Sequence, residues 1–195
     1  MILNTFKIKM YFTVGVLSFV IVTSGCIRMS EQIRDKSAGL NGSFEISENG
    51  LPVNWLMYTP NTVPDADFQI ILDKESYKDG KQSLKFEIKR CLPTGGRHSP
   101  GFTNEWFDKK EGRYLISFWI KTSGTAYRIR AGGVEAKSGD MRTLIDGYEK
   151  IDDWKYLKYE IVVPKGRWLR MELNILNAGQ FWIDNVKIEK INENT

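Results

Sequence analysis

Residues 181–188 read FWIDNVKI, an apolar and strand-like run with one carboxylate, Asp184, at its centre. A charge that is buried without a partner is costly, so Asp184 needs a dedicated counterpart. A candidate lies far upstream in LNGSFE, residues 40–45, which ends on Glu45. If the first and last strands of the domain meet, these two carboxylates could share a cation. The run therefore predicts how the domain closes, and it identifies no ligand.

Strand-like alternation recurs along the rest of the chain. Four segments place apolar residues at every second position: Leu84-Phe86-Ile88, Tyr114-Ile116-Phe118-Ile120, Leu157-Tyr159-Ile161-Val163 and Leu169-Met171-Leu173-Ile175. A period of two with one apolar face is typical of half-buried antiparallel strands. Turn signals separate the strands at Asp79-Gly80, Ser123-Gly124 and Lys165-Gly166.

The pattern as a whole favours an all-β fold. No segment of ordinary helical length carries an apolar stripe, and residues 135–148 are expected to form a long loop or an irregular edge. Several short strands with turns between them predict a two-sheet antiparallel β-sandwich of jelly-roll type. We expect this domain to occupy residues 40–192.

Length and charge narrow the classes of function. The length of 195 residues suggests one ordinary globular domain, and the formal net charge is +4. The basic residues are spread among acidic ones rather than clustered, so we expect no nucleic-acid partner.

The N-terminus has the order of an export signal. Lys7 and Lys9 precede an uncharged apolar segment, residues 10–22, which is shorter than the roughly 20 residues needed to span a bilayer. VTSGC, residues 22–26, resembles a bacterial lipobox, so residues 1–25 are expected to be removed and Cys26 to carry lipid. A plain signal peptide or a short uncleaved anchor is the alternative.

A lipid on Cys26 would place the protein outside the cytoplasm. We expect it to be exported and anchored in the cell membrane or outer membrane, with the polar residues 26–39 as a tether. Cys91 would then have no disulfide partner. Without the lipid, a Cys26–Cys91 bridge becomes possible in an oxidising compartment.

Catalytic arrangements are hard to build from this composition. The chain has one histidine, His98, and its neighbour Ser99 is adjacent in sequence, which is not the geometry of a nucleophile and its base. The same count excludes a zinc site made mainly of His and Cys. Three carboxylate pairs lie in contexts that specify no chemistry: Asp65/Asp67, Glu105/Asp108 and Asp152/Asp153. We therefore expect no enzyme, with a minimal hydrolase as a remote alternative.

A set of motifs in one order suggests a family. The motifs are NGSFE (41–45), GLPVNW (50–55), GKQSLKF (80–86), YLISFWIK (114–121) and GQFWIDNV (179–186). Their order and spacing, which span nearly the whole domain, resemble jelly-roll carbohydrate-binding modules of the cellulose-binding CenC type, within the galactose-binding-like fold.

This resemblance implies a structural calcium ion near the two ends of the domain. On matching positions, Glu45 and Asp184 would supply carboxylate oxygens, and backbone carbonyls near Asn41 and in residues 74–81 would complete a shell of six to eight oxygens. The alternative is that both carboxylates bond to Lys, Arg or backbone amides without metal. Neither arrangement would take part in catalysis.

Sugars bind aromatic faces flanked by polar side chains. Trp168 leads a polar strand face with Arg170 and Glu172, whereas Trp119 shares its face with polar residues of another strand. We expect both to line one groove, although Trp119 could instead fill the second layer and Trp168 could cap a sheet edge. The remaining candidates are Arg128, on a polar strand face, and Trp106, in an expected loop.

The sequence thus predicts a non-catalytic, surface-anchored carbohydrate-binding lipoprotein with a structural calcium site. A structural or protein-interaction lipoprotein of the cell envelope, with the same fold and no affinity for sugar, is the alternative.

Overall fold

The computed structural model describes residues 32–136 and 139–192. The expected signal peptide and Cys26 lie outside the described residues. Within the described part of the chain, no helix is long and apolar enough to cross a membrane.

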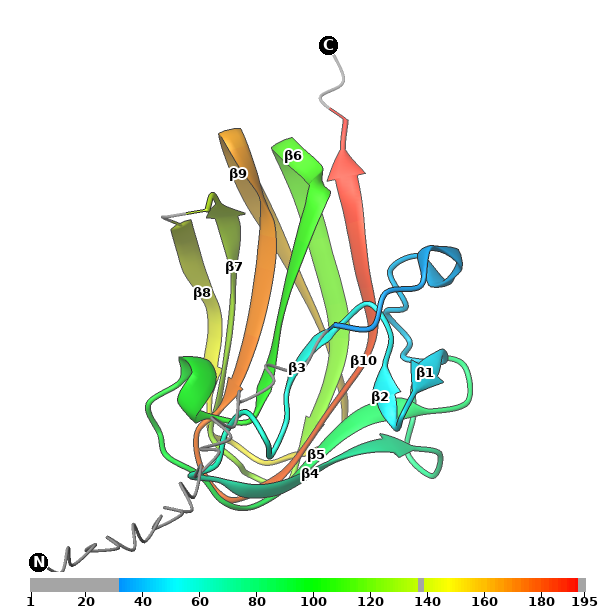
Figure 1. Cartoon of the computed structure of the whole chain (residues 1–195), viewed down its shortest axis with the longest axis vertical. Coiled ribbons are helices and arrows are strands. Elements are labelled where there is room, and N and C mark those ends of the chain that lie inside the picture. The colour runs from blue at the N-terminus through cyan, green and yellow to red at the C-terminus, as the bar shows by residue number, and fades with distance from the viewer. Residues whose placement is uncertain (1–31, 137–138, 193–195) are drawn as a thin grey trace, which may run out of the picture.

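The regular secondary structure of the described residues is almost entirely strand, with two short 3₁₀ helices. In chain order the elements are η1 (Lys36–Ala38), β1 (Ser47–Glu48), β2 (Leu51–Pro52), β3 (Leu56–Tyr58), β4 (Asp67–Asp73), β5 (Ser83–Arg90), η2 (Gly96–His98), β6 (Gly101–Thr122), β7 (Tyr127–Val134), β8 (Gly139–Gly147), β9 (Ile151–Ile175) and β10 (Gly179–Ile191) (Figure 1).

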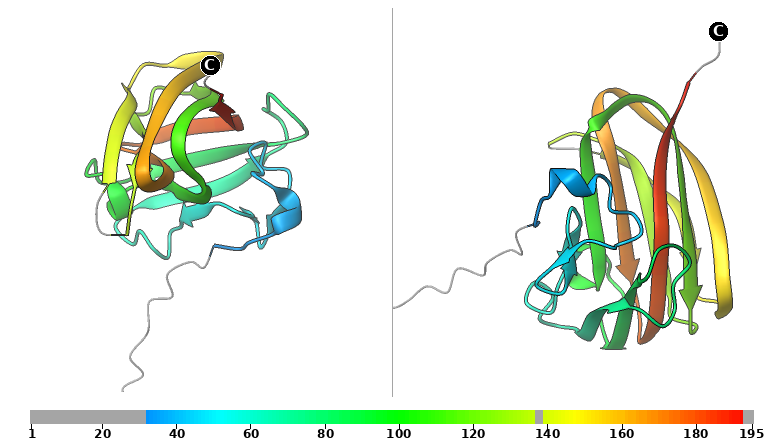
Figure 2. Two further views of the ribbon diagram at one scale, coloured as in Figure 1. Left: turned by 90° about the horizontal axis from the view of Figure 1, so that it is seen from above. Right: turned by 90° about the vertical axis from the view of Figure 1, so that its right-hand side faces the viewer.

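The long strands β6 and β9 each serve two sheets. Residues 101–106 of β6 pair with 169–174 of β9, and residues 112–122 pair with 151–163. The register shifts between these two blocks, where both strands bend over. Seen edge on, β6 and β9 arch from one layer into the other (Figure 2).

Two five-stranded layers result. The front sheet has the order β3, first half of β6, second half of β9, β7, β8. The back sheet has the order β4, β5, β10, second half of β6, first half of β9. All these neighbours are antiparallel, which confirms the predicted all-β sandwich.

The core lies between the two sheets and follows the predicted alternation. Leu169, Met171, Leu173 and Ile175 are completely buried, and the apolar positions of the second half of β6 are equally inaccessible. Trp55 packs edge-on against Phe102, with ring centroids 4.8 Å apart. Because successive side chains of a strand point to opposite sides, the polar residues between these positions face outward.

Of two expectations about local structure, one is half right and one is wrong. Residues 139–147 form the edge strand β8, which pairs with β7 along one side with a register shift, so the edge alternative holds and the loop alternative does not. An edge strand needs no continuous apolar face, so its sequence pattern is weak. Trp106 lies in β6 rather than in a loop, because β6 begins at Gly101, ahead of the alternating segment that starts at Tyr114.

The two ends of the domain meet, as the sequence predicts. The N–H of Val186 donates to the carbonyl of Gly42 at 2.9 Å. The expected tether is also in contact with the domain in its described part, since the Gln32 amide donates to the Asn104 side chain at 2.8 Å.

Candidate functional site

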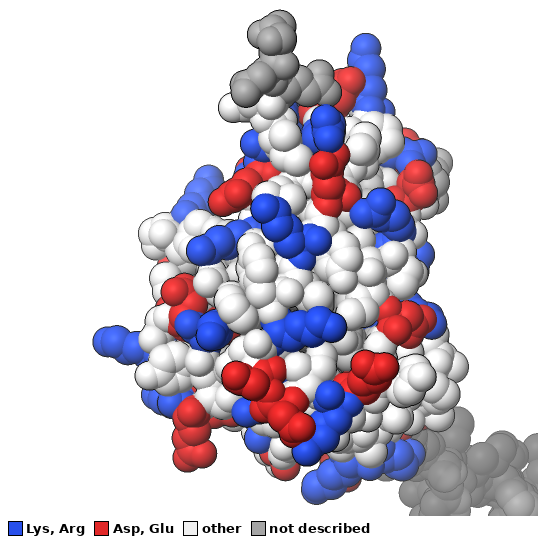
Figure 3. Space-filling model, turned by 180° about the vertical axis from the view of Figure 1, so that it is seen from behind, with Lys and Arg blue, Asp and Glu red and all other residues white. Residues whose placement is uncertain are grey.

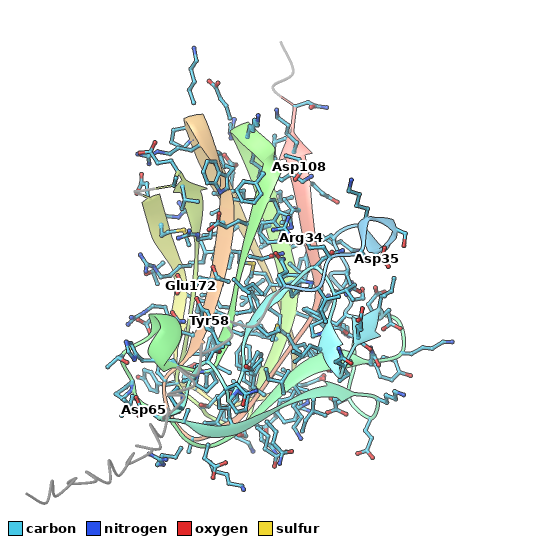
Figure 4. The ribbon with its side chains drawn as sticks, in the orientation of Figure 1. Arg34, Asp35, Tyr58, Asp65, Asp108 and Glu172 are labelled. Carbon is cyan, nitrogen blue, oxygen red and sulfur yellow. The ribbon has the colours of Figure 1, made fainter. Side chains whose placement is uncertain are left out.

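Several predicted ligand residues converge on the outer face of the front sheet. Because Leu169 and Met171 point inward, Trp168, Arg170 and Glu172 point outward from β9. The register places neighbours of the same face beside them: Glu105 and Gly132 flank Arg170, and Thr103 and Arg130 flank Glu172. Figure 4 labels Glu172 and Tyr58 of β3, which belong to this sheet and are separated by the first half of β6.

Glu105 organises the centre of this front face. Its Oε2 accepts a hydrogen bond from Trp168 Nε1 at 2.8 Å, and its Oε1 accepts from Arg170 Nε at 2.9 Å and also from Arg170 Nη2. Phe107, which is 49% exposed, packs on Trp168 with ring centroids 5.1 Å apart. One carboxylate therefore fixes both an indole and a guanidinium.

Sequence reasoning considered Glu105 only as a possible acid beside Asp108. The sequence around Glu105 gives only a weak strand signal, because Thr103, Asn104 and Glu105 are three consecutive polar residues.

Trp106 lines a pocket of about 640 Å³ beside this centre. It leans edge-on against the buried Trp55, with ring centroids 5.9 Å apart. The opposite wall comes from the N-terminal segment, including Arg34 and Asp35, and Asp108 contributes at the rim (Figure 4). The pocket thus extends the front face at the edge where β3 has ended.

Charges on the front face largely satisfy one another. Arg128 donates to Asp146 Oδ2 through Nε at 2.8 Å and Nη2 at 2.6 Å. Arg170 is paired with Glu105, and Arg130 donates to the Met141 carbonyl at 3.3 Å. The face consequently offers hydrogen-bonding groups with little unbalanced charge.

A loop covers one end of the face. Asn174 lies beneath Gly95 and Gly96, and its amide donates to the Gly96 carbonyl at 3.4 Å. Ser99 is buried, with its hydroxyl accepting from Gly95 N–H at 3.0 Å and donating to the Leu92 carbonyl at 2.8 Å. These bonds explain Ser99 as a structural residue of the loop and leave it no role as a nucleophile.

Most of the candidate acids are held by local contacts, and Asp67 lies 3.9 Å from Lys89. Asp108 pairs with Lys109, Asp152 pairs with Lys150, and Asp153 caps the N–H of Trp154. None of these contacts frames a cleft between two carboxylates, as glycoside hydrolysis requires.

Trp119 lies on the other side of the molecule. It belongs to the second half of β6, where it is opposite Asp184 on one side and Tyr156 on the other. The predicted groove shared by Trp168 and Trp119 is therefore wrong, because β6 crosses from the front sheet to the back sheet between Trp106 and Gly112.

The predicted metal residues gather around the loop that precedes β5. Asp184 is completely buried, and its Oδ2 accepts from the N–H groups of Lys78 at 2.6 Å and Asp79 at 2.9 Å. Glu45 Oε1 accepts from the N–H groups of Lys81 at 2.9 Å and Gln82 at 3.2 Å. The two carboxylates thus clamp one loop from both ends, and a Cβ on Gly80 would lie 2.3 Å from Glu45 Oε1.

This arrangement supplies part of a calcium site. Burial raises the pKa of Asp184 to about 6, against the lowering effect of its three backbone N–H donors, and the charge of Asp79 raises it further. The carbonyl of Asn41 already accepts from Trp55 Nε1 and from Phe44 N–H, which occupies both of its lone pairs. Within the described ranges no three Asp, Glu, His or Cys side chains group as a metal site.

Calcium therefore stays a prediction. The described contacts match the alternative without metal, because Asp184 and Glu45 both accept hydrogen bonds from backbone N–H groups. A calcium shell would need further oxygens besides these carboxylates, such as carbonyls of the clamped loop.

Comparisons with known proteins bear on the fold. No family model matches the chain, and no curated protein matches its sequence. The CBM22-1 xylan-binding domain of Paenibacillus barcinonensis Xyn10C superposes with a TM-score of 0.56 at 16% identity, covering 78% of this chain and 94% of that domain. The chain therefore has the same β-sandwich fold as this domain.

Two further structures agree with this β-sandwich assignment. A xylan-binding domain from CBM22 gives a TM-score of 0.53 at 14% identity, covering 76% of this chain and 92% of its own. A CBM4 structure gives a TM-score of 0.52 at 14% identity, covering 77% of this chain and 98% of its own. At such identities the likeness establishes the fold, and the ligand has to be argued from this chain's own residues.

Proposed function

We propose that the protein is a non-catalytic carbohydrate-binding module whose front face holds a neutral polysaccharide. The observation that carries this proposal is the Glu105 centre, which fixes Trp168 and Arg170 side by side on an outward-facing sheet. The xylan-binding proteins that share the fold support the choice of ligand class.

Each group at this centre has a role in binding. The Trp168 ring is held by its Nε1 bond to Glu105 and by Phe107, so a sugar ring can stack on it without first ordering the indole. Arg170 uses Nε and Nη2 on Glu105, which leaves Nη1 to donate to a hydroxyl. Glu172 and Arg130 present an acceptor and a donor one row away.

Trp106 and its pocket extend this surface beyond the sheet. A polymer that crosses the front face can continue from Trp168 toward the N-terminal segment, past Arg34 and Asp108. Concave sites with aromatic walls and a few polar groups are the usual form of small-ligand sites.

The predicted lipid on Cys26 would place this module at a membrane surface of an exported protein. Binding would then attach a polysaccharide to the cell envelope. Labelled fatty acid should be incorporated into the native chain and not into a Cys26→Ser variant. Equal labelling of both proteins would contradict the anchor.

The predicted calcium ion would stabilise the fold without touching the front face. Adding excess chelator should lower the thermal midpoint if the ion is bound at Glu45 and Asp184. An unchanged midpoint would reject the ion and leave the backbone clamp as the whole explanation.

Affinity electrophoresis of the detergent-solubilised full chain tests the binding function. The gels would contain xylan, a mixed-linkage glucan or mannan. We expect retardation by at least one of these neutral polymers, and a loss of at least tenfold in affinity for Trp168→Ala. Tyr148→Ala is the matched control, because Tyr148 is an aromatic residue that is 75% exposed outside the front face. No retardation by any polymer would favour the protein-interaction alternative.

A further inference from the structure

The outer face of the back sheet carries a second, differently built surface. Lys85 Nζ and Lys121 Nζ each lie 5.1 Å from the centroid of the Trp182 ring. Lys78 Nζ lies 4.4 Å from the centroid of Trp119. We call these five residues the lysine–tryptophan band.

The register explains why the band is continuous. Lys85 of β5, Trp182 of β10 and Lys121 of β6 lie directly opposite one another in one row across three strands. Trp119 lies two residues from Lys121 on the same side of β6. With strands about 4.8 Å apart, the two row lysines are separated by about 10 Å.

The tryptophan in the middle of the row is fixed. Trp182 Nε1 donates to Asp73 Oδ2 at 2.7 Å, and the side chain is only 7% exposed beneath the lysine stems. An ammonium group above an indole face is held there by the ring quadrupole. The lysine heads are therefore positioned before any ligand arrives.

The cations of the band are incompletely balanced. Lys85 has an ion pair with Glu87 at 3.4 Å, and Lys121 donates to the Ser76 hydroxyl at 3.3 Å. Among the described residues, neither Lys78 nor Lys121 has a carboxylate within 4.0 Å of its ammonium nitrogen. Figure 3 looks onto this side, where basic residues lie among uncharged surface across its middle.

An open aromatic residue adjoins these cations. Tyr156 is 48% exposed and lies opposite Trp119, with ring centroids 5.1 Å apart. Stacking rings next to spaced ammonium groups suit a polymer of sugar rings that carries carboxylates at intervals. A neutral polysaccharide could accept hydrogen bonds from the lysines but would leave their charge uncompensated.

We propose that the lysine–tryptophan band is a second binding surface, specific for an acidic polysaccharide of the uronic-acid type. The lysines pair with carboxylates, and the exposed ring of Tyr156, which packs against Trp119, supplies the stacking surface. This surface is separate from the front face and does not depend on the function proposed for it.

Affinity electrophoresis of the detergent-solubilised full chain in polygalacturonate tests the proposal. We expect retardation at low salt that weakens as salt is added, because exposed charges are screened. A Lys78→Gln/Lys121→Gln variant should lose about tenfold in affinity. The matched control is Lys36→Gln/Lys165→Gln, which removes the same charge from η1 and from the bend of β9, outside the rows of the band, and should bind almost as well as the native chain.

Two further measurements separate this surface from the front face. Trp168→Ala should bind polygalacturonate normally, and the Lys78/Lys121 variant should bind neutral polymers normally. No retardation in polygalacturonate at low salt would overturn the proposal. Equal losses of polygalacturonate affinity in the Lys78/Lys121 variant and its control would also overturn the proposal, because net charge alone would then explain the binding.

Discussion

The front and back faces of this sandwich are built from the same two strands and differ in how their charges are used. On the front face, Arg170 and Arg128 are each committed to a carboxylate, Glu105 and Asp146. On the back face, three lysines lie over tryptophan rings, and only Lys85 of the three has an ion pair among the described residues. Ion pairing thus prepares one face for hydroxyl groups, and cation–π contacts prepare the other for carboxylates.

The largest expected effect comes from the two carboxylates, Asp184 and Glu45, that clamp the loop carrying Lys78 on the back face. Asp184→Ala leaves the N–H groups of Lys78, Asp79 and Asn185 without their acceptor in a buried position. We expect the free energy of unfolding to fall by about 3 kcal/mol, since unsatisfied buried donors cost about 1–3 kcal/mol each and water can reach some of them.

Denaturant melts measure this loss of unfolding free energy. Affinity electrophoresis below the melting midpoint then measures how the loss changes ligand binding. Polygalacturonate binding should fall because the loop that holds Lys78 over Trp119 is released, whereas binding of neutral polymers should persist. Equal damage to both activities would show that the two faces are coupled.

The titration of Asp184, on the back face, should make the stability of the protein depend on pH. Burial raises its pKa to about 6, above the unfolded value of 3.8. The protonated carboxyl therefore stabilises the fold below about pH 4, and this stabilisation is lost as the pH rises through 6. At about 1.4 kcal/mol per pKa unit, and with some relaxation of the protein around the charge, the free energy of unfolding should fall by roughly 2 kcal/mol.

This pH effect is measured in metal-free protein as the difference in unfolding free energy between the native chain and Asp184→Asn. The difference should change between pH 4 and pH 7, and calcium bound at Asp184 would suppress that change by stabilising the ionised form. A constant difference across this range would contradict the raised pKa.

A smaller effect, confined to the front face, is expected from Glu105→Gln. The amide keeps one acceptor and loses the charge that pairs with Arg170, so Trp168 and Arg170 become less ordered. We expect about a tenfold loss in neutral-polymer affinity with polygalacturonate binding unchanged. Glu189→Gln, at an exposed position of β10 in the other sheet, provides the control, and an effect of equal size there would remove Glu105 from the centre of the site.

The smallest expected effect is that of Asp146→Ala. Its pair with Arg128 is solvent-exposed, with the two side chains 38% and 48% accessible, so its loss should cost less than 1 kcal/mol of stability. If the thermal midpoint of Asp146→Ala falls as far as that of Asp184→Ala, the front-face ion pairs stabilise the fold rather than prepare the face for a ligand.

Local pattern predicted much of this architecture. The alternation over Tyr114–Ile120 and Leu169–Ile175 identified strands, inward positions and outward candidates, because a side-chain period of two is a local property. The meeting of Gly42 with Val186 also followed, since a carboxylate buried at Asp184 required a distant partner.

The crossing of β6 and β9 could not be predicted in this way. Alternation continues on either side of the bend near residues 107–111, and nothing local states which sheet each half joins. Trp119 and Trp168 were consequently assigned to one groove, and Glu105 went unrecognised in a strand whose polar residues Asn104 and Glu105 are adjacent. Sheet membership is fixed by packing across the whole domain.

Indole N–H resonances in a two-dimensional ¹⁵N spectrum of the full chain test most directly whether the two faces bind different ligands. With each tryptophan assigned by a Phe variant, a neutral xylan oligosaccharide should shift Trp168 and Trp106 and leave Trp119 and Trp182 in place. A galacturonic acid oligomer should do the reverse. The same set of tryptophans responding to both oligomers, or no response to either, would contradict the account.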